Sequence, residues 1–305
     1  EGPCARYYDC LKFKLEARFM EKNICVNCHH STVSAVEKWL EYCPQCHLWR
    51  AHLQGRFNES QEGLCHLRNF GFRDLRIANF KKILTVLGEL TQLENRTIID
   101  IGCANGWFVD EAQKLKMQAS GIEPEPTIAE IGINQGLPIR VGFFPDILSS
   151  GERFDTMIFN DVFEHLPDPV KMFQECHSRL NENGFLILNI PSSRGLFYRL
   201  AVFFAKIGFR SPLARLWQVN FYTPHLFYFD PVNLTEMASK FGFEKVAHTR
   251  LLSVKLSGLW ERLNIPGEPI PLLKRVALYA GIAAASPFIN YLLPPDAFVI
   301  FFRKI

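Results

Sequence analysis

Four cysteines near the start of the chain have the spacing of metal ligands. Cys25 and Cys28 form one Cys-x-x-Cys pair, Cys43 and Cys46 form a second, and 14 residues separate the two pairs. Two such pairs match a tetrahedral four-thiolate zinc site, in which each pair forms a knuckle with both sulfurs on one side of a turn. Because four protein ligands leave no open position on the metal, we expect the zinc ion to be structural. A redox-active cysteine pair is the alternative, which the presence of two pairs disfavours.

A second pattern places a carboxylate and several small residues at the end of an apolar strand. The segment IIDIGCANGWF carries Asp100 near the end of the strand, followed by a turn that contains Gly102, Ala104 and Gly106. Small residues allow the backbone to approach a ligand closely. Glu123 ends the next strand about 20 residues further on, where a carboxylate can accept both hydroxyls of a ribose. This order of strand, turn, helix, strand and acid predicts a nucleotide-type ligand site.

The turn differs from the Gly-x-Gly-x-x-Gly of dinucleotide sites, and Asp100 would repel a pyrophosphate there. A ligand with a positively charged amino group suits that carboxylate better. The pattern resembles motif I of class I S-adenosylmethionine-dependent methyltransferases, with Ala104 in place of the middle glycine. The resemblance implies that Asp100 and the turn 102–106 hold the methionine part of the cofactor and that Glu123 holds its ribose. We expect further cofactor contacts from Phe144, Asn160 and Asp161.

A related strand and turn occur at 153–169, with the sequence RFDTMIFNDVFEHLPDP. They resemble the fourth strand of the branch that includes ubiquinone-biosynthesis O-methyltransferases and zinc-binding sugar C-methyltransferases. In the sugar enzymes the matching Glu-His pair is thought to remove a proton from the acceptor, which implies catalytic roles for Glu164 and His165. His165 is the better base candidate because the reference pKa of histidine lies near neutrality. A helix-capping glutamate beside a packed histidine is the structural alternative.

Polar groups on an aromatic background follow the fifth expected strand. Ligands of such folds bind outside the carboxyl ends of the strands, where this segment begins. We therefore predict that the acceptor contacts some of Asn189, Asn220, Tyr222, His225 and Tyr228. An aromatic core patch whose polar tips reach solvent is the alternative for each single residue.

The composition is that of a globular protein. The 305 residues are 48% hydrophobic and 21% charged, and the net charge is only +3, which does not by itself predict nucleic-acid binding. From about residue 96, strands alternate with helices, which predicts an α/β fold with a doubly wound, mostly parallel sheet, closed by two strands near the C-terminus. We expect a helical lead-in at 1–24, the zinc ribbon at 25–50, a helical connector covering the cofactor site at 51–95, and the methyltransferase domain at 96–305 with an apolar insertion at about 250–296.

Two apolar segments have several interpretations. Residues 276–293 carry no charge, but Pro287 and Asn290 interrupt them, so we expect a buried or interface-lying helix pair rather than a membrane span. Residues 195–209 combine four phenylalanines with Arg199 and Lys206, which predicts a cap helix on the core. A lid that holds an apolar substrate or touches a membrane is the alternative. The odd, clustered cysteines favour a reducing compartment, so we expect a cytoplasmic protein, with peripheral membrane contact through 195–209 and 276–293 as an alternative.

These patterns together predict an S-adenosylmethionine-dependent methyltransferase acting on oxygen or carbon of a small-molecule, saccharide or lipid-linked acceptor. An RNA or protein methyltransferase guided by the ribbon is the alternative enzyme. The ribbon contains only Lys38 and Arg50 as cations, balanced by Glu37 and Glu41, so nucleic acid is a disfavoured partner. A third hypothesis is a non-catalytic scaffold that binds S-adenosylmethionine.

Overall fold

The computed structural model describes residues 23–55, 72–263 and 271–305. The expected lead-in at 1–24 falls almost wholly outside these residues. The same holds for the part of the expected connector between 56 and 71. The remainder of that connector is α3 (Arg73–Leu90), a long helix whose buried face includes Phe80, Leu84 and Leu87.

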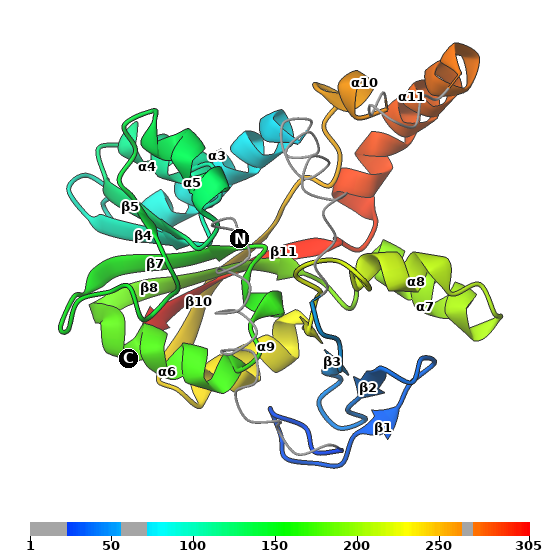
Figure 1. Cartoon of the computed structure of the whole chain (residues 1–305), viewed down its shortest axis with the longest axis horizontal. Coiled ribbons are helices and arrows are strands. Elements are labelled where there is room, and N and C mark those ends of the chain that lie inside the picture. Colours follow the sequence, from blue (N-terminus) through cyan, green and yellow to red (C-terminus); the bar gives the residue numbers. More distant parts are fainter. Residues whose placement is uncertain (1–22, 56–71, 264–270) are drawn as a thin grey trace, which may run out of the picture.

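A seven-stranded sheet forms the centre of the molecule (Figure 1). Its strand order is β10-β11-β8-β7-β4-β5-β6, and β11 runs antiparallel to both of its neighbours while the remaining pairs are parallel. This confirms the predicted doubly wound, mostly parallel fold. The strands are β4 (Thr97–Ile101), β5 (Gln118–Glu123), β6 (Ile139–Val141), β7 (Phe154–Asn160), β8 (Leu180–Pro191), β10 (Phe243–Arg250) and β11 (Ala297–Lys304).

Helices cover both faces of this sheet because its strands are apolar on both sides. Successive strand residues point to opposite faces. Ile98 accordingly packs in a core with α3 and α4, whereas Ile99 packs in a second core with α6 and α9. Such burial on both faces is expected of parallel strands. The covering helices are α4 (Trp107–Gln113), α5 (Pro126–Ile133), α6 (Pro169–Arg179) and α9 (Pro231–Ser239).

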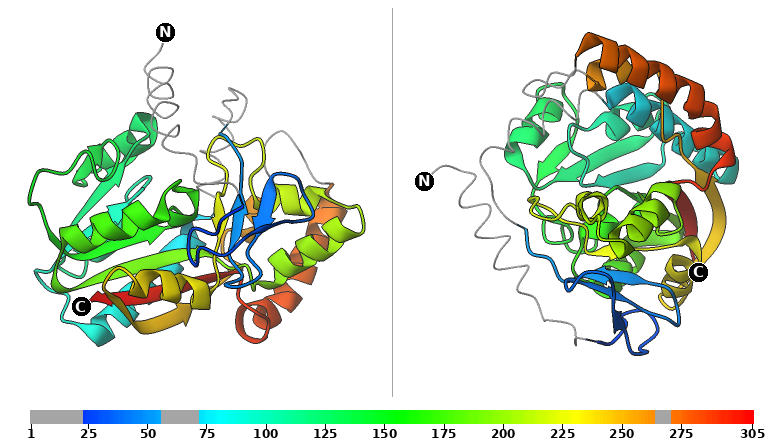
Figure 2. Two further views of the ribbon diagram at one scale, coloured as in Figure 1. Left: turned by 90° about the horizontal axis from the view of Figure 1, so that it is seen from below. Right: turned by 90° about the vertical axis from the view of Figure 1, so that its right-hand side faces the viewer.

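The N-terminal ribbon forms part of a second, small antiparallel sheet. Its order is β1-β2-β3-β9, with β1 (Val33–Ser34), β2 (Leu40–Tyr42), β3 (Trp49–Ala51) and β9 (Phe227–Tyr228). The last strand comes from the methyltransferase domain, more than one hundred and seventy residues after β3. Figure 2 shows the blue ribbon strands lying against that domain. The ribbon is therefore built into the domain through main-chain pairing.

Most of segment 195–209 forms an amphipathic helix, α7 (Leu196–Lys206). It is followed by α8 (Ser211–Leu216). The inner face of α7 packs through Tyr198, Ala201 and Ala205 in a core that also contains residues of the ribbon sheet. This agrees with the predicted cap helix, although the surface that it covers belongs partly to the small sheet. Several of its phenylalanines remain exposed.

Of the predicted buried or interface-lying helix pair at 276–293, the pairing and the burial are wrong, whereas the interface-lying alternative stays a prediction. The segment belongs to a single helix, α11 (Leu272–Pro287), which continues as a π-helical turn, η3 (Phe288–Leu292). The four-residue α10 (Leu259–Arg262) precedes α11 in the chain. Leu272–Leu292 is long and apolar enough to cross a membrane, and its apolar window is 0% buried. The pattern of the sequence indicated apolarity but could not show that the fold leaves this helix without a core partner.

Candidate functional site

The turn after β4 has a backbone that only small residues can form. Gly102 and Gly106 have φ values of +74° and +77°, in the left-handed region that favours glycine. A Cβ at Gly102 would lie 2.6 Å from a methyl group of Val162, and one at Gly106 would lie 2.7 Å from Leu137. Ala104 also has a positive φ, of 47°. The predicted glycine turn therefore exists, and its small residues bring it against the loop that follows β7.

Glu123 fixes this turn to the end of β5. Its Oε2 accepts a 2.9 Å hydrogen bond from the Ala104 amide, and its Oε1 accepts one of 2.9 Å from the Glu125 amide. Each carboxylate oxygen retains a further lone pair, so the side chain can still accept ribose hydroxyls. Burial raises the pKa of Glu123 to about 7, against the opposing effect of these amide hydrogen bonds.

Asp100 is a buried carboxyl group that lacks a cationic partner among the described residues. It is 2% exposed, accepts a 3.1 Å hydrogen bond from Asn160 Nδ2, and takes part in none of the ion pairs found among the described residues. Burial raises the pKa of Asp100 to about 7, and the neighbouring Glu123 adds to this shift while Asn160 opposes it. The two acids therefore interact electrostatically at one edge of the sheet, where the sequence predicted that both would lie. A cationic ligand group would relieve the cost of ionising this pair.

A chain of side-chain amides crosses three neighbouring strands to reach Asp100. Asn189 on β8 donates through Nδ2 to Asn160 Oδ1 at 3.4 Å, and Asn160 on β7 donates in turn to Asp100 on β4. Asn160 and Asn189 are paired in register. The structure thus brings Asn160 to the predicted cofactor acid. It gives Asn189, which we expected to contact the acceptor, a role in orienting Asn160.

Two further residues expected at the cofactor lie on the loops around this edge. Phe144 follows β6 and packs edge-to-face on Phe159 of β7, with ring centroids 6.0 Å apart. Asp161 follows β7 directly, with a φ of 55° and its amide bonded to the Asn189 carbonyl at 2.9 Å. Their cofactor contacts stay predictions.

The predicted catalytic pair lies on a 3-10 turn, η2 (Phe163–His165), immediately after β7. Nδ1 of His165 is 3.0 Å from the Pro224 carbonyl, which fixes the ring with its donor on Nδ1 and leaves Nε2 without a proton in the neutral form. Burial lowers the pKa of His165 to about 4, so the imidazole is neutral near pH 7. Glu164 is 1% exposed, and burial followed by the nearby Asp161 raises its pKa well above the usual range.

His225 joins this pair from a distant part of the chain. Glu164 Oε1 lies 4.0 Å from Nε2 of His165 and 3.9 Å from Nε2 of His225, and the two imidazole centroids are 4.6 Å apart. Burial, and next the neighbouring His165, lower the pKa of His225 well below its usual value. Gln218 Nε2 lies 2.9 Å from His225 Nε2 and donates to it, a contact that sequence reasoning missed. Its only signal was its place in the same aromatic segment.

The other expected acceptor contacts are distributed differently. Tyr228 is 3% exposed, and its hydroxyl donates to the Leu216 carbonyl at 3.1 Å within a cluster of aromatic rings. This placement argues against its predicted contact with the acceptor. Asn220 is exposed and has a φ of 68°, whereas Tyr222 is half-buried with its carbonyl against Gly55. No observation brings these two residues to the imidazole cluster, and their roles stay predictions.

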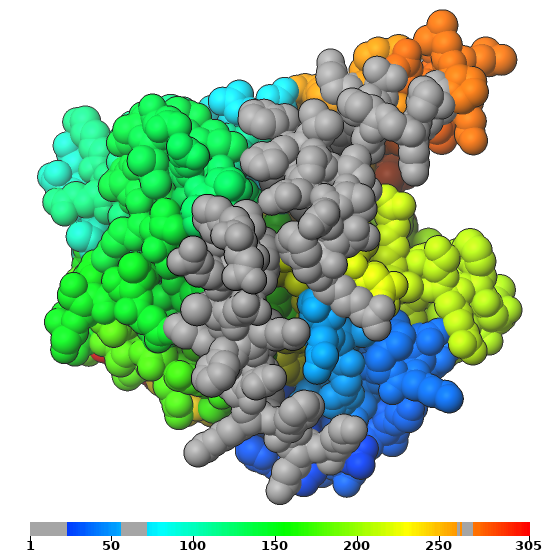
Figure 3. All heavy atoms as spheres, in the orientation of Figure 1, coloured from blue at the N-terminus to red at the C-terminus, as the bar shows by residue number. Residues whose placement is uncertain are grey.

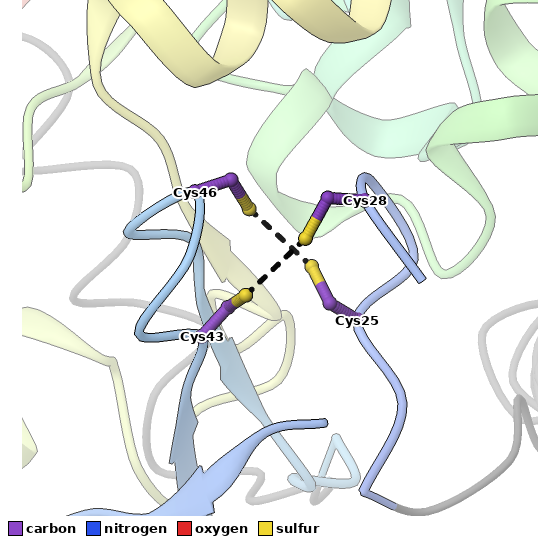
Figure 4. A group of neighbouring side chains, drawn as sticks. All are labelled: Cys25, Cys28, Cys43 and Cys46. Carbon is purple, nitrogen blue, oxygen red and sulfur yellow. Dashed lines mark hydrogen bonds between the residues drawn. The ribbon is translucent and has the colours of Figure 1, made fainter. Parts of the chain in front are cut away.

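The four cysteines converge on one point (Figure 4). Sγ of Cys25 lies 3.5 Å from that of Cys46, Sγ of Cys28 lies 3.4 Å from that of Cys43, and all four sulfurs lie within 4.8 Å of one another. In a tetrahedron with Zn–S bonds of about 2.3 Å, sulfurs are about 3.8 Å apart. The donor set therefore suggests a zinc knuckle site.

The two knuckles have the same backbone. The amides of His29 and His47 donate to the carbonyls of Cys25 and Cys43, each at 2.9 Å, and both histidines have left-handed φ values near 60°. The two imidazoles are exposed, so they lie outside the sulfur cluster. The thiols alone form the donor set, as predicted.

The ribbon is fixed to the methyltransferase domain close to these cysteines. Asn233 of α9 donates through Nδ2 to the Cys46 carbonyl and accepts through its own carbonyl from Asn27, both at 3.2 Å. Strand β3 pairs with β9, and the Leu226 amide donates to the Glu164 carbonyl at 2.9 Å. The ribbon thus supports the strand that places His225 beside Glu164.

Comparison with known proteins agrees with this geometry. A family model described as "Methyltransferase domain" matches residues 71–248, more than half of the chain. The chain belongs to the class I S-adenosylmethionine-dependent methyltransferases. The cofactor edge, the β7 turn and the segment around His225 all lie inside the matched range of this methyltransferase domain, whereas the cysteine ribbon and the 250–296 insertion lie outside it.

Curated relatives of this methyltransferase are distant. A ubiquinone biosynthesis O-methyltransferase of Xanthomonas euvesicatoria is 25% identical over 118 residues, which cover 36% of this chain and 49% of that protein. One of Haemophilus ducreyi is 24% identical over 145 residues, which cover 44% of this chain and 61% of that protein. The chain spans about half the length of the curated relatives it matches.

Solved structures share the fold. A chain from the complex of the Haloferax volcanii Trm112 methyltransferase activator with a methyltransferase aligns with a TM-score of 0.55 and 11% identity, covering 82% of this chain and 99% of that chain. The cyclopropane synthase MmaA2 of Mycobacterium tuberculosis aligns with a TM-score of 0.52 and 16% identity, covering 73% and 83%. These likenesses support the fold alone.

The raised pKa values of Asp100 and Glu123 predict a pH-dependent affinity for S-adenosylmethionine. A cationic amino group binds the ionised form of Asp100, and ionisation becomes complete only above its pKa of about 7. We expect the association constant measured by calorimetry to rise roughly tenfold between about pH 6 and pH 8 and then to level off. Asp100→Asn should weaken binding and flatten this profile. Asp110→Asn, on the exposed side of α4, is the control, and a pH-independent affinity of the unmodified protein would contradict the assignment.

Proposed function

We propose that this methyltransferase transfers a methyl group from S-adenosylmethionine to an oxygen or an acidic carbon of a small-molecule, saccharide or lipid-linked acceptor. The observation that carries the proposal is the presence of a neutral, oriented imidazole, His165, on the turn that directly follows the strand bearing Asn160. The partial likeness to ubiquinone biosynthesis O-methyltransferases favours oxygen as the receiving atom.

The donor end of the site is provided by the two acids. Asp100 accepts hydrogen bonds from the amino group of the methionine part, and Asn160 holds the carboxylate in place through its amide. Glu123 accepts from the ribose hydroxyls while its two oxygens stay bonded to the turn. When bound, S-adenosylmethionine supplies an electrophilic methyl group on sulfur. The remaining task of the protein is to align the acceptor with it and to remove a proton.

His165 is suited to take that proton on Nε2. Its Nδ1 donor is occupied by the Pro224 carbonyl, so the other nitrogen carries the lone pair. Proton transfer creates an imidazolium in a buried setting, and the Glu164 carboxyl 4.0 Å away stabilises it when ionised. His225 approaches the same Oε1 of Glu164, with its ring packed against that of His165. We therefore assign His165 as the base and Glu164 as the residue that supports it.

Substitution of His165 tests this assignment. His165→Ala should lower the turnover number by a factor on the order of 10² to 10⁴, since it removes proton abstraction and leaves the donor acids in place. The affinity for S-adenosylmethionine, measured by calorimetry, should change less than about threefold, a bound we set because the Asp100 and Glu123 contacts remain. The acceptor pool is surveyed by transfer of label from the cofactor to extracted metabolites and lipids. His248→Ala, which replaces an exposed histidine of β10, is the control. Full activity of His165→Ala would show that His165 has only a packing role.

We further propose that Cys25, Cys28, Cys43 and Cys46 hold one structural zinc ion. The convergent sulfurs and the repeated knuckle backbone support this assignment. Because all four ligands come from the protein, the ion has no open position for an acceptor or a water molecule. Its function would be to hold the ribbon in shape, and thereby to keep β3 paired with β9 beside His225.

Removal of one thiolate tests the zinc site. Cys25→Ser should lower the zinc content measured by atomic absorption from one ion per chain toward zero and lower the melting temperature by several degrees, since structural zinc stabilises the fold directly. Turnover should also fall, because the strand that positions His225 loses its partner. Cys176→Ser, in α6 and outside the group of four convergent thiols, should retain the metal. A metal-free preparation of the unmodified protein that melts cooperatively at an unchanged temperature would contradict the proposal.

A further inference from the structure

Helix α11 has an inverted distribution of polar and apolar residues. In α11 and η3 as the structure describes them, the buried side chains are two polar ones, Ser286 and Asn290. Large apolar residues point outward instead, including Leu273 at 84% exposure and Leu292 at 73%. Apolar patches of this kind on a folded protein mark a surface that binds something.

The C-terminal end of this helix is fastened to the sheet by specific polar contacts. Asn290 accepts from the amides of Ser253 and Val254 at 3.0 Å, and its own amide donates to the Val254 carbonyl at 2.8 Å. Arg250, at the end of β10, donates to the carbonyls of Tyr291 and Leu293. The buried polar side therefore holds the helix in place while the apolar side faces away from the domain.

The connections of α11 argue against a membrane span. Both ends of the insertion join the same edge of the sheet, at Arg250 and Ala297. The N-terminal part of α11 is contacted by Trp260, whose ring lies 4.3 Å from the Arg275 guanidinium. In a span, the non-helical segment 251–258, which starts beside Asn290 and leads to Trp260, would lie at the depth of the hydrocarbon core. A hydrocarbon core is about 30 Å thick and excludes lipid-exposed irregular backbone.

Helix α7 presents a second surface of the same kind. Its buried side is formed by Tyr198 and two alanines, whereas Phe203 is 57% exposed. Ile207 and Phe209 extend this surface just beyond the helix, with 67% and 59% exposure. The larger apolar side chains again face outward, so α7 is more than a cap on the small sheet.

The two helices leave the sheet at one corner. Pro191 at the end of β8 pairs in register with Ala297 at the start of β11. Asp296 bonds through its side chain to the Phe197 amide at 2.8 Å, so the first turn of α7 lies against the segment that follows η3. Figures 1 and 2 show both helices projecting beyond the sheet from this corner, and Figure 3 shows them as two lobes. The corner belongs to the edge that carries Asp100 and Glu123.

The charges of these lobes are of one sign. Residues 195–216 and 271–295 contain no aspartate or glutamate, and their cations are Arg199, Lys206, Arg210, Arg215, Lys274 and Arg275. Arg210 pairs with Glu37 of the ribbon at 3.2 Å. Outward apolar residues among cations alone are the pattern of a helix that lies in the interface of an anionic bilayer.

We propose that α7 and α11 together dock this protein on the surface of an anionic lipid bilayer, with their apolar sides at the level of the headgroups and without crossing the membrane. This docking rests on the exposed helices and not on the proposed methyl transfer. If the transfer also holds, the cofactor edge would face acceptors that reside in or at the lipid.

Sedimentation with vesicles tests the docking. The full-length protein should sediment with phosphatidylcholine–phosphatidylglycerol vesicles at physiological salt, and poorly with phosphatidylcholine alone. High salt or alkaline carbonate should release it, as expected of a peripheral protein. Two double variants, Ile207→Ser with Leu273→Ser and Lys206→Glu with Lys274→Glu, should each weaken binding roughly tenfold or more. All four side chains are exposed, so the fold should be retained, which thermal melting checks.

Matched substitutions elsewhere serve as controls. Ile133→Ser in α5 replaces an apolar side chain of 41% exposure, and Lys171→Glu reverses an exposed charge in α6. Neither should alter vesicle binding. Equal binding to neutral and anionic vesicles, or unchanged binding of the double variants, would overturn the proposal. Retention in the membrane pellet after carbonate treatment would indicate a span. A dimer that the double variants dissociate, in a protein that binds no vesicles, would indicate that a second copy covers these helices. Each of these results would also overturn the proposal.

Discussion

Two buried carboxyl groups that form no ion pair among the described residues impose an electrostatic constraint on this structure. Asp100 and Glu123 lie at neighbouring strand ends, and burial raises both pKa values to about 7. For Asp100 the shift from 3.8 corresponds to roughly 4 kcal/mol that disfavours the ionised form. A fold does not keep such groups for stability alone, since apolar residues would pack there at lower cost. In the proposed function, the surrounding architecture fixes the geometry of these acids, and the ligand supplies the positive charge.

The fixed geometry is supplied by neighbouring strands. Because β4, β5, β7 and β8 are parallel, their carboxyl ends meet at one edge, and each contributes one polar side chain there. Asn189 orients Asn160, and Asn160 orients Asp100. These hydrogen bonds run across the strands and restrict the rotamers of the three side chains. The same edge continues into η2, where burial keeps the imidazole of His165 neutral near pH 7. In the proposed function, donor binding and proton removal are thus separate tasks performed on adjacent loops.

The ribbon and the two outer helices extend this edge in different directions. The ribbon contributes strands to a sheet whose last member, β9, comes from the methyltransferase domain, so the order of the cysteine cluster near Cys46 is coupled to the position of His225. The helices α7 and α11 start from one corner and present apolar surface outward. An acceptor that is apolar or tethered to lipid would be consistent with both features, since the ribbon side is packed and the helical side is open to an interface.

The sequence by itself determined the elements whose cause is local. The spacing of the cysteine pairs, the small residues of the turn 102–106 and the alternation of strand and helix each follow from short-range geometry, and all three are found as expected. Asp100 and Glu123 could be paired from the sequence because parallel strands bring their carboxyl ends together. Tertiary structure alone decided that His225 lies beside Glu164, about sixty residues away in the sequence. It also decided that the Tyr228 hydroxyl donates to the Leu216 carbonyl and that α11 lies outside the core. These outcomes depend on which surfaces remain after packing, and an apolar pattern is the same whether a helix is covered by protein or by lipid.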